Sequence, residues 1–406
     1  MSNVSKKFLK YVSFDTQSLH DQECYPSTAK QLSFANDVLK QECINIGLSD
    51  VNVDKYGYVT ATLPSNVDKQ CPVIAFIAHM DTSPDAPGAN VKPQVIENYN
   101  GLDINLNNDV ILSPSEFSSL KNYVGKTLIT TDGTTLLGAD NKAGIAEILE
   151  AMEYLIAHDE IPHGTIKIVF TPDEEVGHGV DFFDTKKLGA EFGYTVDGGE
   201  LGELEYETFS AARAKLIFRG KSIHPGNAYK IMKNAALIAS EFIEELPKSE
   251  TPSTTRGREG FFHLTKMSGA VDTAELDIII RDFETDSFEN RKKLIVSITD
   301  EINKKYGEGT AILEIKDEYR NMSEVIIQKF EIVELAKRAF EECNITPIIT
   351  PVRGGTDGSR LSFMGLPTPN IFTGAHNFHG PYEYICVESM EKAVDAIVSI
   401  SKLNAQ

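Results

Sequence analysis

Residues 141–170 read NKAGIAEILEAMEYLIAHDEIPHGTIKIVF, and this stretch decides the fold. Its first part, 141–159, predicts an amphipathic helix with one apolar face, formed by Ile145, Ile148, Leu149, Met152, Leu155 and Ile156. Its end, TIKIVF (165–170), is a continuous apolar and β-branched run, typical of a strand covered on both faces. PVIAFIA (72–78) is a second such run. A strand, a long helix and another strand indicate α/β architecture with some parallel pairing.

A second pattern of strands and helices occupies residues 208–321. The order of its expected elements is β-α-β-β-α-β, that of a ferredoxin-like unit. The strands are expected at 212–220, 261–267, 274–283 and 310–316, and the helices at 228–245 and 287–307. Further helical and strand patterns continue from 323 to 406. The sequence therefore predicts one α/β domain, built from residues 1–207 and 322–406, that is interrupted by a smaller inserted domain.

Size and composition limit the possible classes of protein. The chain has 406 residues, which favours two domains, and its 41% apolar and 24% charged residues are typical of a globular protein. Its longest apolar run, Cys71 to Ala78, is too short to cross a membrane, and the N-terminus lacks the apolar segment of a signal peptide. Five cysteines without a CxxC pair favour reduced thiols and a cytoplasmic location. A formal net charge of −21 argues against nucleic-acid binding.

Polar clusters follow both buried strands, at the sheet edge where α/β proteins place their ligand sites. His79 and Asp81 end the first strand, and the alternation of a strand would put them on one side. A carboxylate commonly holds a metal-binding imidazole in the required tautomer. Taken alone, however, the pair is better explained as an ordinary strand end.

Three successive carboxylates follow the second strand: Asp173, Glu174 and Glu175. Such groups repel each other unless they are solvated, cap a helix or bind cations. Adjacent glutamates can divide a catalytic task, because one can bind a metal while the other takes a proton from water. A solvated acidic turn and a metal site explain this run about equally well.

Three further segments carry weak signals on their own. Asp140 stands where the N-cap of the long helix belongs, and capping alone would explain it. Asp197 lies in the sequence VDGG, which contains a common turn signal. His376 and His379 lie in GAHNFHGP, where glycine and proline favour a loop, so at most one of them is expected to be a ligand.

Together these signals are stronger than any one of them. The set comprises two imidazoles and three carboxylates: His79, Asp140, Glu175, Asp197 and His379. This combination suits zinc, or cobalt and manganese as substitutes. Five such groups can hold two metal ions if one carboxylate bridges them, at a separation of about 3.5–4 Å.

An ordered series of motifs resembles the co-catalytic zinc family of carboxypeptidases, dipeptidases and aminoacylases. The motifs are HMD (79–81), GADNKAG (138–144), PDEE (172–175), VDGG (196–199), IHPG (223–226), GGTDG (354–358) and HGP (379–381). The resemblance covers nearly the whole chain. It implies a zinc-exopeptidase-like α/β fold, in which helices flank a mixed sheet and the ferredoxin-like insert is a lid or dimerisation domain.

The resemblance also implies a role for each ligand. Two zinc ions per subunit would be held, with Co²⁺ or Mn²⁺ as possible substitutes. The ligands would be His79 and Asp197 for one ion, Glu175 and His379 for the other, and Asp140 as the bridge. His376 matches no ligand position of the family.

Further residues acquire roles through the same resemblance. Asp81 would orient the first histidine, and Glu174 would be the base that activates water and later protonates the leaving amine. His224 resembles the family histidine that reaches into the site from the insert, which makes it the oxyanion donor, with an ordinary loop histidine as the alternative. Arg281 and Arg353 are candidates for binding the carboxylate of the peptide, with ordinary salt bridges as the alternative.

The activity implied by the resemblance is that of a di-zinc aminopeptidase which removes the N-terminal residue of tripeptides. Its partners would be short peptides, and the insert would either close over the substrate or join two subunits in a homodimer. A dipeptidase or an N-acyl amino acid deacylase of the same family is the nearest alternative. A non-catalytic metal-binding protein is a more distant one, because Glu174 is retained beside the full ligand set.

Overall fold

The computed structural model describes residues 1–107 and 109–406, and the chain splits into two compact units. Unit 1 consists of Met1–Tyr206, Glu324–Thr350 and Thr356–Gln406, and unit 2 consists of Glu207–Ser323 and Pro351–Gly355. Unit 2 thus extends slightly beyond the insert expected at 208–321. The segment 351–355, expected in the α/β domain, belongs to unit 2 instead. The reason is backbone pairing, because Val352 exchanges hydrogen bonds with Glu207 and Phe209.

The centre of unit 1 is an eight-stranded mixed sheet with the order β1-β2-β8-β3-β9-β16-β10-β15. The middle strands β8, β3 and β9 are parallel, whereas β1 with β2, β2 with β8 and β10 with β16 are antiparallel. The strands are β1 (Ser49–Val53), β2 (Val59–Leu63), β3 (Ile74–His79), β8 (Ile166–Thr171), β9 (Phe192–Gly198), β10 (Glu203–Glu205), β15 (Ile348–Ile349) and β16 (Asn370–Phe372). The predicted mixed α/β sheet is confirmed.

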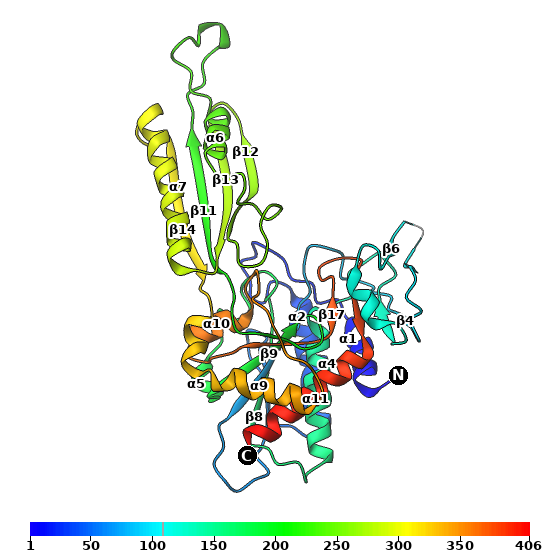
Figure 1. Ribbon diagram of the computed structural model, residues 1–406. Coiled ribbons are helices and arrows are strands. Elements are labelled where there is room, and N and C mark those ends of the chain that lie inside the picture. Colours follow the sequence, from blue (N-terminus) through cyan, green and yellow to red (C-terminus); the bar gives the residue numbers. More distant parts are fainter. Residues whose placement is uncertain (108) are drawn as a thin grey trace. The chain divides into compact units, whose positions relative to one another are not determined.

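Helices flank this sheet, and α4 is the one that positions the site. It packs against α1, α11, β3 and β9 (Figure 1). Its close approach to β9 depends on Gly144, where a Cβ atom would lie only 2.0 Å from the carbonyl oxygen of Val196. The helices are α1 (Asn3–Val12), α4 (Ala139–Ala157), α5 (Thr185–Leu188), α8 (Ser323–Ile326), η4 (Ile327–Lys329), α9 (Glu331–Glu342), α10 (Asp357–Phe363) and α11 (Val387–Asn404). In the described part of the chain, no helix combines the length and apolar character needed to span a membrane.

The helical segment 29–45, which follows α1, is irregular. It consists of α2 (Ala29–Phe34), a π-helical turn η1 (Ala35–Leu39) and α3 (Lys40–Asn45). The spacing of Thr28 and Gln31 is that of a capping box, but the side chain of Thr28 makes no capping hydrogen bond to this helix. The Thr28 hydroxyl donates to the Gln17 carbonyl, and the Gln31 amide reaches Asp173. A long-range hydrogen bond thus replaces the local cap.

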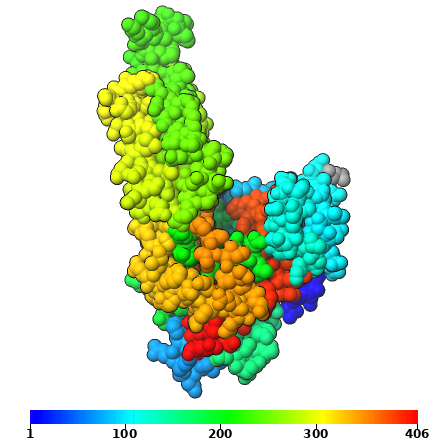
Figure 2. All heavy atoms as spheres, viewed as in Figure 1, coloured from blue at the N-terminus to red at the C-terminus, as the bar shows by residue number. Residues whose placement is uncertain are grey.

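A compact lobe of unit 1 lies between β3 and α4 in the sequence (cyan in Figure 2). It contains β4 (Gln94–Ile96), β5 (Ile104–Asn105), β6 (Ile111–Leu112), η2 (Ser118–Tyr123) and β7 (Leu128–Thr130). Two strands from the end of the chain, β17 (Ala375–His376) and β18 (Tyr384–Cys386), complete a small sheet in the order β17-β18-β7-β4. This sheet joins the start of α4 to the histidine-bearing turn that follows β17.

Unit 2 is a four-stranded antiparallel sheet with the order β12-β13-β11-β14. Its elements are β11 (Ser210–Arg219), η3 (Pro225–Asn227), α6 (Ala235–Glu244), β12 (Phe261–Gly269), β13 (Thr273–Asp282), α7 (Thr285–Tyr306) and β14 (Ala311–Tyr319). The predicted β-α-β-β-α-β order of the insert is confirmed. Helix α6 begins later than the expected residue 228, because Asn234 caps it by accepting the N–H groups of Ala236 and Leu237.

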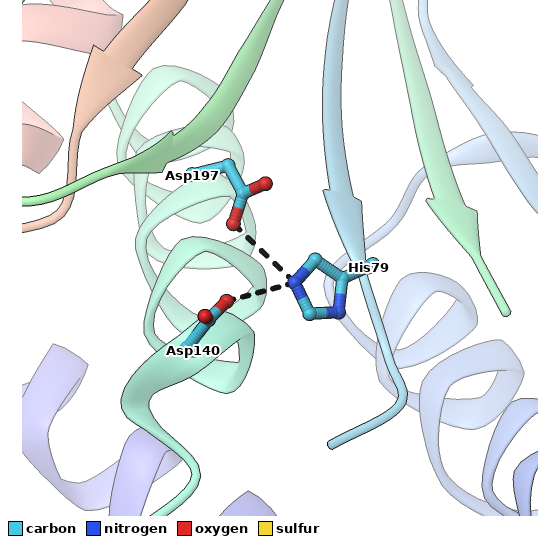
Figure 3. A group of neighbouring side chains, drawn as sticks. All are labelled: His79, Asp140 and Asp197. Carbon is cyan, nitrogen blue, oxygen red and sulfur yellow. Dashed lines mark hydrogen bonds and ion pairs between the residues drawn. The ribbon is translucent and has the colours of Figure 1, made fainter. Parts of the chain in front are cut away.

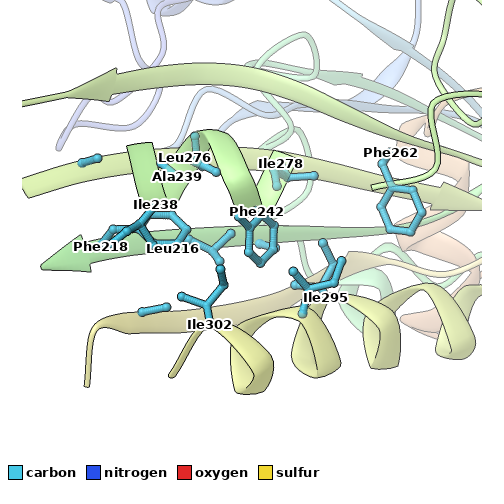
Figure 4. Close-up of a cluster of buried hydrophobic side chains, with 14 of the residues drawn as sticks. Leu216, Phe218, Ile238, Ala239, Phe242, Phe262, Leu276, Ile278, Ile295 and Ile302 are labelled. Carbon is cyan, nitrogen blue, oxygen red and sulfur yellow. The ribbon is translucent and has the colours of Figure 1, made fainter. Parts of the chain in front are cut away.

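The core of unit 2 lies between one face of its sheet and the two helices α6 and α7 (Figure 4). Alternate side chains of each strand point to this face, as the period of a strand requires. The core includes Leu216 and Phe218 of β11, Leu276 and Ile278 of β13, Ile238 and Phe242 of α6, and Ile295 and Ile302 of α7. Unit 2 therefore has a hydrophobic core of its own.

Candidate metal centre

The first group of candidate ligands gathers where β3, β9 and the start of α4 meet (Figure 3). His79 is the last residue of β3, Asp197 lies near the end of β9, and Asp140 lies in the first turn of α4. The Nε2 atom of His79 is 2.8 Å from Asp140 Oδ1 and 3.4 Å from Asp197 Oδ1. Three ligand atoms from three distant segments therefore surround one point.

The second group shares Asp140 with the first and adds Glu175 and His379. The Nε2 atom of His379 is 2.8 Å from Glu175 Oε2 and 3.3 Å from Asp140 Oδ2. The two oxygens of Asp140 are thus turned to two different histidines. This is the geometry expected of a carboxylate that bridges two metal ions.

The donor set fits a pair of metal ions. At Zn–N and Zn–O distances of about 2.0–2.1 Å, tetrahedral ligands lie about 3.3 Å from one another. The pairs His79–Asp197 and His379–Asp140 have 3.4 and 3.3 Å between their ligand atoms, and the other two pairs, at 2.8 Å, are closer than this spacing. In residues 1–107 and 109–406, Glu175 Oε1 is a buried oxygen without a hydrogen-bond partner. Imidazole and carboxylate ligands in this ratio suit zinc, cobalt or manganese.

The electrostatics of the site also favour bound cations. Burial, reinforced by the negative charge of Asp140, raises the pKa of Glu175 to about 8. Burial likewise raises the pKa of Asp197 to about 6. These carboxylates are therefore costly to ionise at neutral pH when no cation offsets their charge.

Asp81 lies behind His79, as an orienting residue would. Its Oδ1 is 3.3 Å from His79 Nδ1, the ring nitrogen that faces away from the ligand group, and its backbone carbonyl oxygen accepts a hydrogen bond from the same nitrogen at 3.2 Å. The same carboxylate accepts the backbone N–H groups of Glu174 and Glu175, at 3.1 and 3.2 Å. Asp81 therefore contacts both a candidate ligand and the loop that carries the candidate base.

Glu174 lies close enough to His79, Asp197 and Glu175 for their charges to act on its carboxyl group, and it belongs to neither ligand group. Burial raises the pKa of Glu174 well above its ordinary value, and the negative charges of Asp197 and Asp357 act in the same direction. In the described part of the chain, nothing donates a hydrogen bond to its carboxylate. A carboxylate that is free of ligation and holds a proton readily has the properties of a general base and acid.

The other three predicted residues belong to unit 2. His224 is exposed and caps η3, because its Nδ1 accepts the N–H of Gly226 at 3.2 Å. Arg281 forms the ordinary ion pair that was its alternative, with 3.3 Å between its Nη2 and Oε2 of Glu318. Its guanidinium also lies over the ring of Tyr319. The roles of His224 and Arg281 in binding substrate stay predictions.

Arg353 is engaged by a loop of unit 2. Its Nη1 donates to the carbonyl oxygens of Gly257 and Glu259, at 2.7 and 2.9 Å, and its Nη2 donates to Thr255 Oγ1 at 3.0 Å. The guanidinium also lies against the ring of Phe209. These bonds hold the segment 351–355 to the loop and leave Arg353 few donors for a carboxylate.

Two acidic residues near the site, Asp85 and Asp173, have no role predicted from the sequence. Asp85 Oδ2 lies 3.3 Å from His379 Nδ1, so each candidate histidine has an aspartate on the ring nitrogen that faces away from the ligands. Asp173, the first acid of PDEE, accepts the Ser27 N–H at 2.6 Å and the Gln31 side-chain amide at 2.7 Å. These bonds hold a residue with a positive φ of 55° at the start of the ligand loop. No local sequence signal links these partners.

Comparisons with known proteins show which family the chain resembles. Residues 132–402 match the family model described as peptidase family M20/M25/M40. A protein named peptidase T from Halothermothrix orenii is 58% identical over 407 residues and covers 100% of both chains. A peptidase T from Clostridium perfringens is 54% identical over 406 residues, again with 100% of both chains covered.

Solved structures show the same fold. The aminopeptidase PepT from Bacillus cereus is 25% identical, with a TM-score of 0.77 and coverage of 100% of this chain and 98% of that one. A tripeptidase from Staphylococcus aureus superposes with a TM-score of 0.79 at 22% identity, over 99% of this chain and 98% of that one. At this identity the second match speaks for the fold alone.

Proposed function

The chain belongs to peptidase family M20/M25/M40, and from this premise we propose that it hydrolyses the N-terminal peptide bond of tripeptides at a pair of zinc ions. The family resemblance expected from the motifs is confirmed, and so is the enzyme class, a metallo-aminopeptidase. The binding of two metal ions, rather than one, is supported by the orientation of Asp140, because one of its oxygens faces His79 and the other faces His379. The substrate class is supported by the full-length similarity to proteins named peptidase T.

In this proposal the two ligand groups hold one ion each. His79 and Asp197 bind the first ion, Glu175 and His379 bind the second, and Asp140 bridges them. When bound, the pair lowers the pKa of a water molecule towards ~7 and polarises the carbonyl of the scissile bond. Asp81 holds His79 through Nδ1, so that Nε2 is free to bind metal.

Glu174 moves the proton. Its carboxylate accepts a proton from the attacking water and passes it to the nitrogen of the leaving amine, which then departs as a neutral group. The raised pKa of Glu174 supports this role, because the side chain must keep the proton between the two steps. Since Asp81 holds the backbone N–H of Glu174, the base is fixed beside the ligands without being bound to a metal.

Two roles predicted from the family resemblance complete the proposal. His224 donates to the oxyanion, and Arg281 binds the carboxylate at the far end of the tripeptide. Arg353 joins Arg281 only if the loop that contains Gly257 and Glu259 releases its guanidinium. The edge strand β12, whose end is exposed, supports pairing with a second subunit in a homodimer. The five free cysteines support a cytoplasmic location.

A panel of alanine peptides tests this function directly. Purified protein loaded with Zn²⁺ is incubated with Ala-Ala-Ala, Ala-Ala, N-acetyl-Ala-Ala-Ala and N-acetyl-alanine, and the products are separated by chromatography. We expect alanine and Ala-Ala from the free tripeptide, and no cleavage of the acetylated one. Preferred cleavage of Ala-Ala would indicate a dipeptidase instead, and release of acetate would indicate a deacylase.

A further inference from the structure

Glu383 is buried beside the metal centre, with only 1% of its surface exposed. Its carboxylate accepts three backbone N–H groups, two from residues just before α4 and one from its first turn. Oε2 accepts those of Leu137 and Gly138, at 2.7 and 2.9 Å, and Oε1 accepts that of Asp140 at 3.0 Å. A carboxylate suits this place because it offers two oxygens and no donor, and because the N-terminus of a helix attracts negative charge.

The backbone that donates these hydrogen bonds to Glu383 is irregular at the start of α4. Gly138 has a φ of 82°, and Asp140 has a φ of −83° and a ψ of 103°, outside the helical range. The N–H groups of such a turn have no helical acceptor and need another partner. Glu383 is that partner, so it stabilises the backbone conformation from which Asp140 directs its two oxygens to the two ligand groups.

Glu383 also belongs to the turn that carries His379. Its own N–H donates to the carbonyl of Gly380 at 3.2 Å, and Asn377 donates to the carbonyl of Tyr382 at 3.1 Å, so the turn is held as one piece. The side chain of Glu383 therefore joins two ligand-bearing segments that lie far apart in the sequence.

We propose that Glu383 is a positioning residue that sets the separation of Asp140 and His379, and thereby completes the second metal site. The inference rests on the proposed pair of metal ions. Without the carboxylate, the start of α4 and the turn of His379 lose their connection, and the site formed by Asp140, Glu175 and His379 is affected most. The site formed by His79 and Asp197 retains two ligands on strands of the central sheet.

If Glu383 only stabilised the fold, its loss would lower stability and leave metal affinity unchanged. Glu388 is a matched control for such a purely structural carboxylate. Glu388 lies five residues further on and also uses its carboxylate to accept a backbone N–H, that of Thr127 at 3.0 and 3.2 Å. This bond connects α11 to β7 and contacts none of the candidate ligands. Loss of Glu388 should therefore cost stability without changing metal binding.

The test compares full-length wild type with Glu383→Gln and Glu388→Gln. Each metal-free protein is titrated with Zn²⁺ by calorimetry, and kcat and KM are measured on Ala-Ala-Ala. We expect two sites in the wild type and in Glu388→Gln. In Glu383→Gln, one site should weaken by about 10–100-fold, the usual effect of losing a group that orients a ligand, and kcat should fall more than KM changes.

The outcomes separate this inference from the proposed function. Two sites of wild-type affinity in Glu383→Gln would overturn the inference and leave the proposed function standing. A wild type that binds no zinc would overturn both. If Glu383→Gln does not fold, Glu383→Asp is tested instead, because the aspartate keeps the negative charge but its side chain is shorter. A selective loss of one site in Glu383→Asp supports the inference, whereas wild-type affinity, or failure of both variants to fold, assigns Glu383 to the fold alone.

Discussion

The carboxylate of Asp81 accepts the backbone N–H of Glu174 at 3.1 Å, and this bond ties the candidate base to the end of β3. The same oxygen lies 3.3 Å from Nδ1 of His79. One buried residue thus contacts both the ring that is to bind metal, through its carboxylate and its backbone carbonyl, and the loop that is to move the proton. A change at Asp81 should disturb metal binding and proton transfer together.

Asp81→Ala should therefore lower metal affinity by about 10–100-fold and reduce kcat even at saturating Zn²⁺. Calorimetric titration and steady-state kinetics on Ala-Ala-Ala measure the two effects. Asp54→Ala is the matched control, because Asp54 also accepts two backbone N–H groups, those of Tyr56 and Tyr58, in the turn between β1 and β2. Equal metal affinity in the two variants would show that Asp81 does not orient His79.

Glu174→Gln should keep both metal ions and lose activity. The amide has nearly the same size but cannot accept the proton of water, so we expect kcat to fall by at least ~10²-fold. Metal content by elemental analysis establishes that the site is intact. Turnover within a few-fold of wild type would remove Glu174 from the mechanism.

Removal of metal should destabilise the protein as well as inactivate it. Asp140, Glu175 and Asp197 bring three carboxylates together, and bound cations offset their repulsion. A ligand present at 1,000 times its Kd stabilises the folded state by about 4 kcal/mol. Chelation should thus lower the melting temperature, and Zn²⁺, Co²⁺ or Mn²⁺ should restore it together with activity. The same melting temperature with and without chelator would argue against a metal site.

Glu205 should make the stability of the metal-free protein depend on pH. Burial, reinforced by the charge of Glu203, raises the pKa of Glu205 to about 8, and the amide of Asn370 donates to it. In the unfolded chain the carboxyl titrates near 4.3, so the folded state holds the proton more tightly. The resulting stability is complete below the unfolded pKa and is lost as the pH rises towards about 8.

Glu205→Gln should flatten this dependence, because the amide does not titrate. One proton contributes at most about 1.4 kcal/mol to the unfolding free energy per pH unit. Urea unfolding of chelated wild type and variant between pH 5 and pH 8.5 gives both slopes. Identical slopes would mean that Glu205 is ionised in the folded protein at neutral pH.

Local periodicity predicted the larger elements of the fold. The run 72–78 corresponds to β3, the run 165–170 to β8 and the helix 141–159 to α4, and the two strands pair in parallel as expected. The small sheet β17-β18-β7-β4 was not predicted, because strands of two or three residues are too short to show a period. Nor was the assignment of 351–355 to unit 2, which depends on the pairing of Val352 with Thr208, a residue distant in sequence.

Candidate ligands could be found in the sequence because each is a polar side chain beside a recognisable element, as His79 is at the end of a strand. Asp85 and Glu383 could not be found in this way. Asp85 contacts a histidine 294 positions away, and Glu383 binds backbone N–H groups 243 to 246 positions away. Backbone donors carry no side-chain signature, so only the folded chain shows that these groups converge.

The claim on which the account depends most is that one chain holds two cations with Asp140 between them. The most direct test is anomalous diffraction at the zinc edge from crystals of the Zn²⁺-loaded protein. We predict two peaks about 3.5–4 Å apart, one beside His79 and Asp197 and the other beside Glu175 and His379, with an oxygen of Asp140 on each. A single peak, or an active protein with no peak at these residues, would contradict the account.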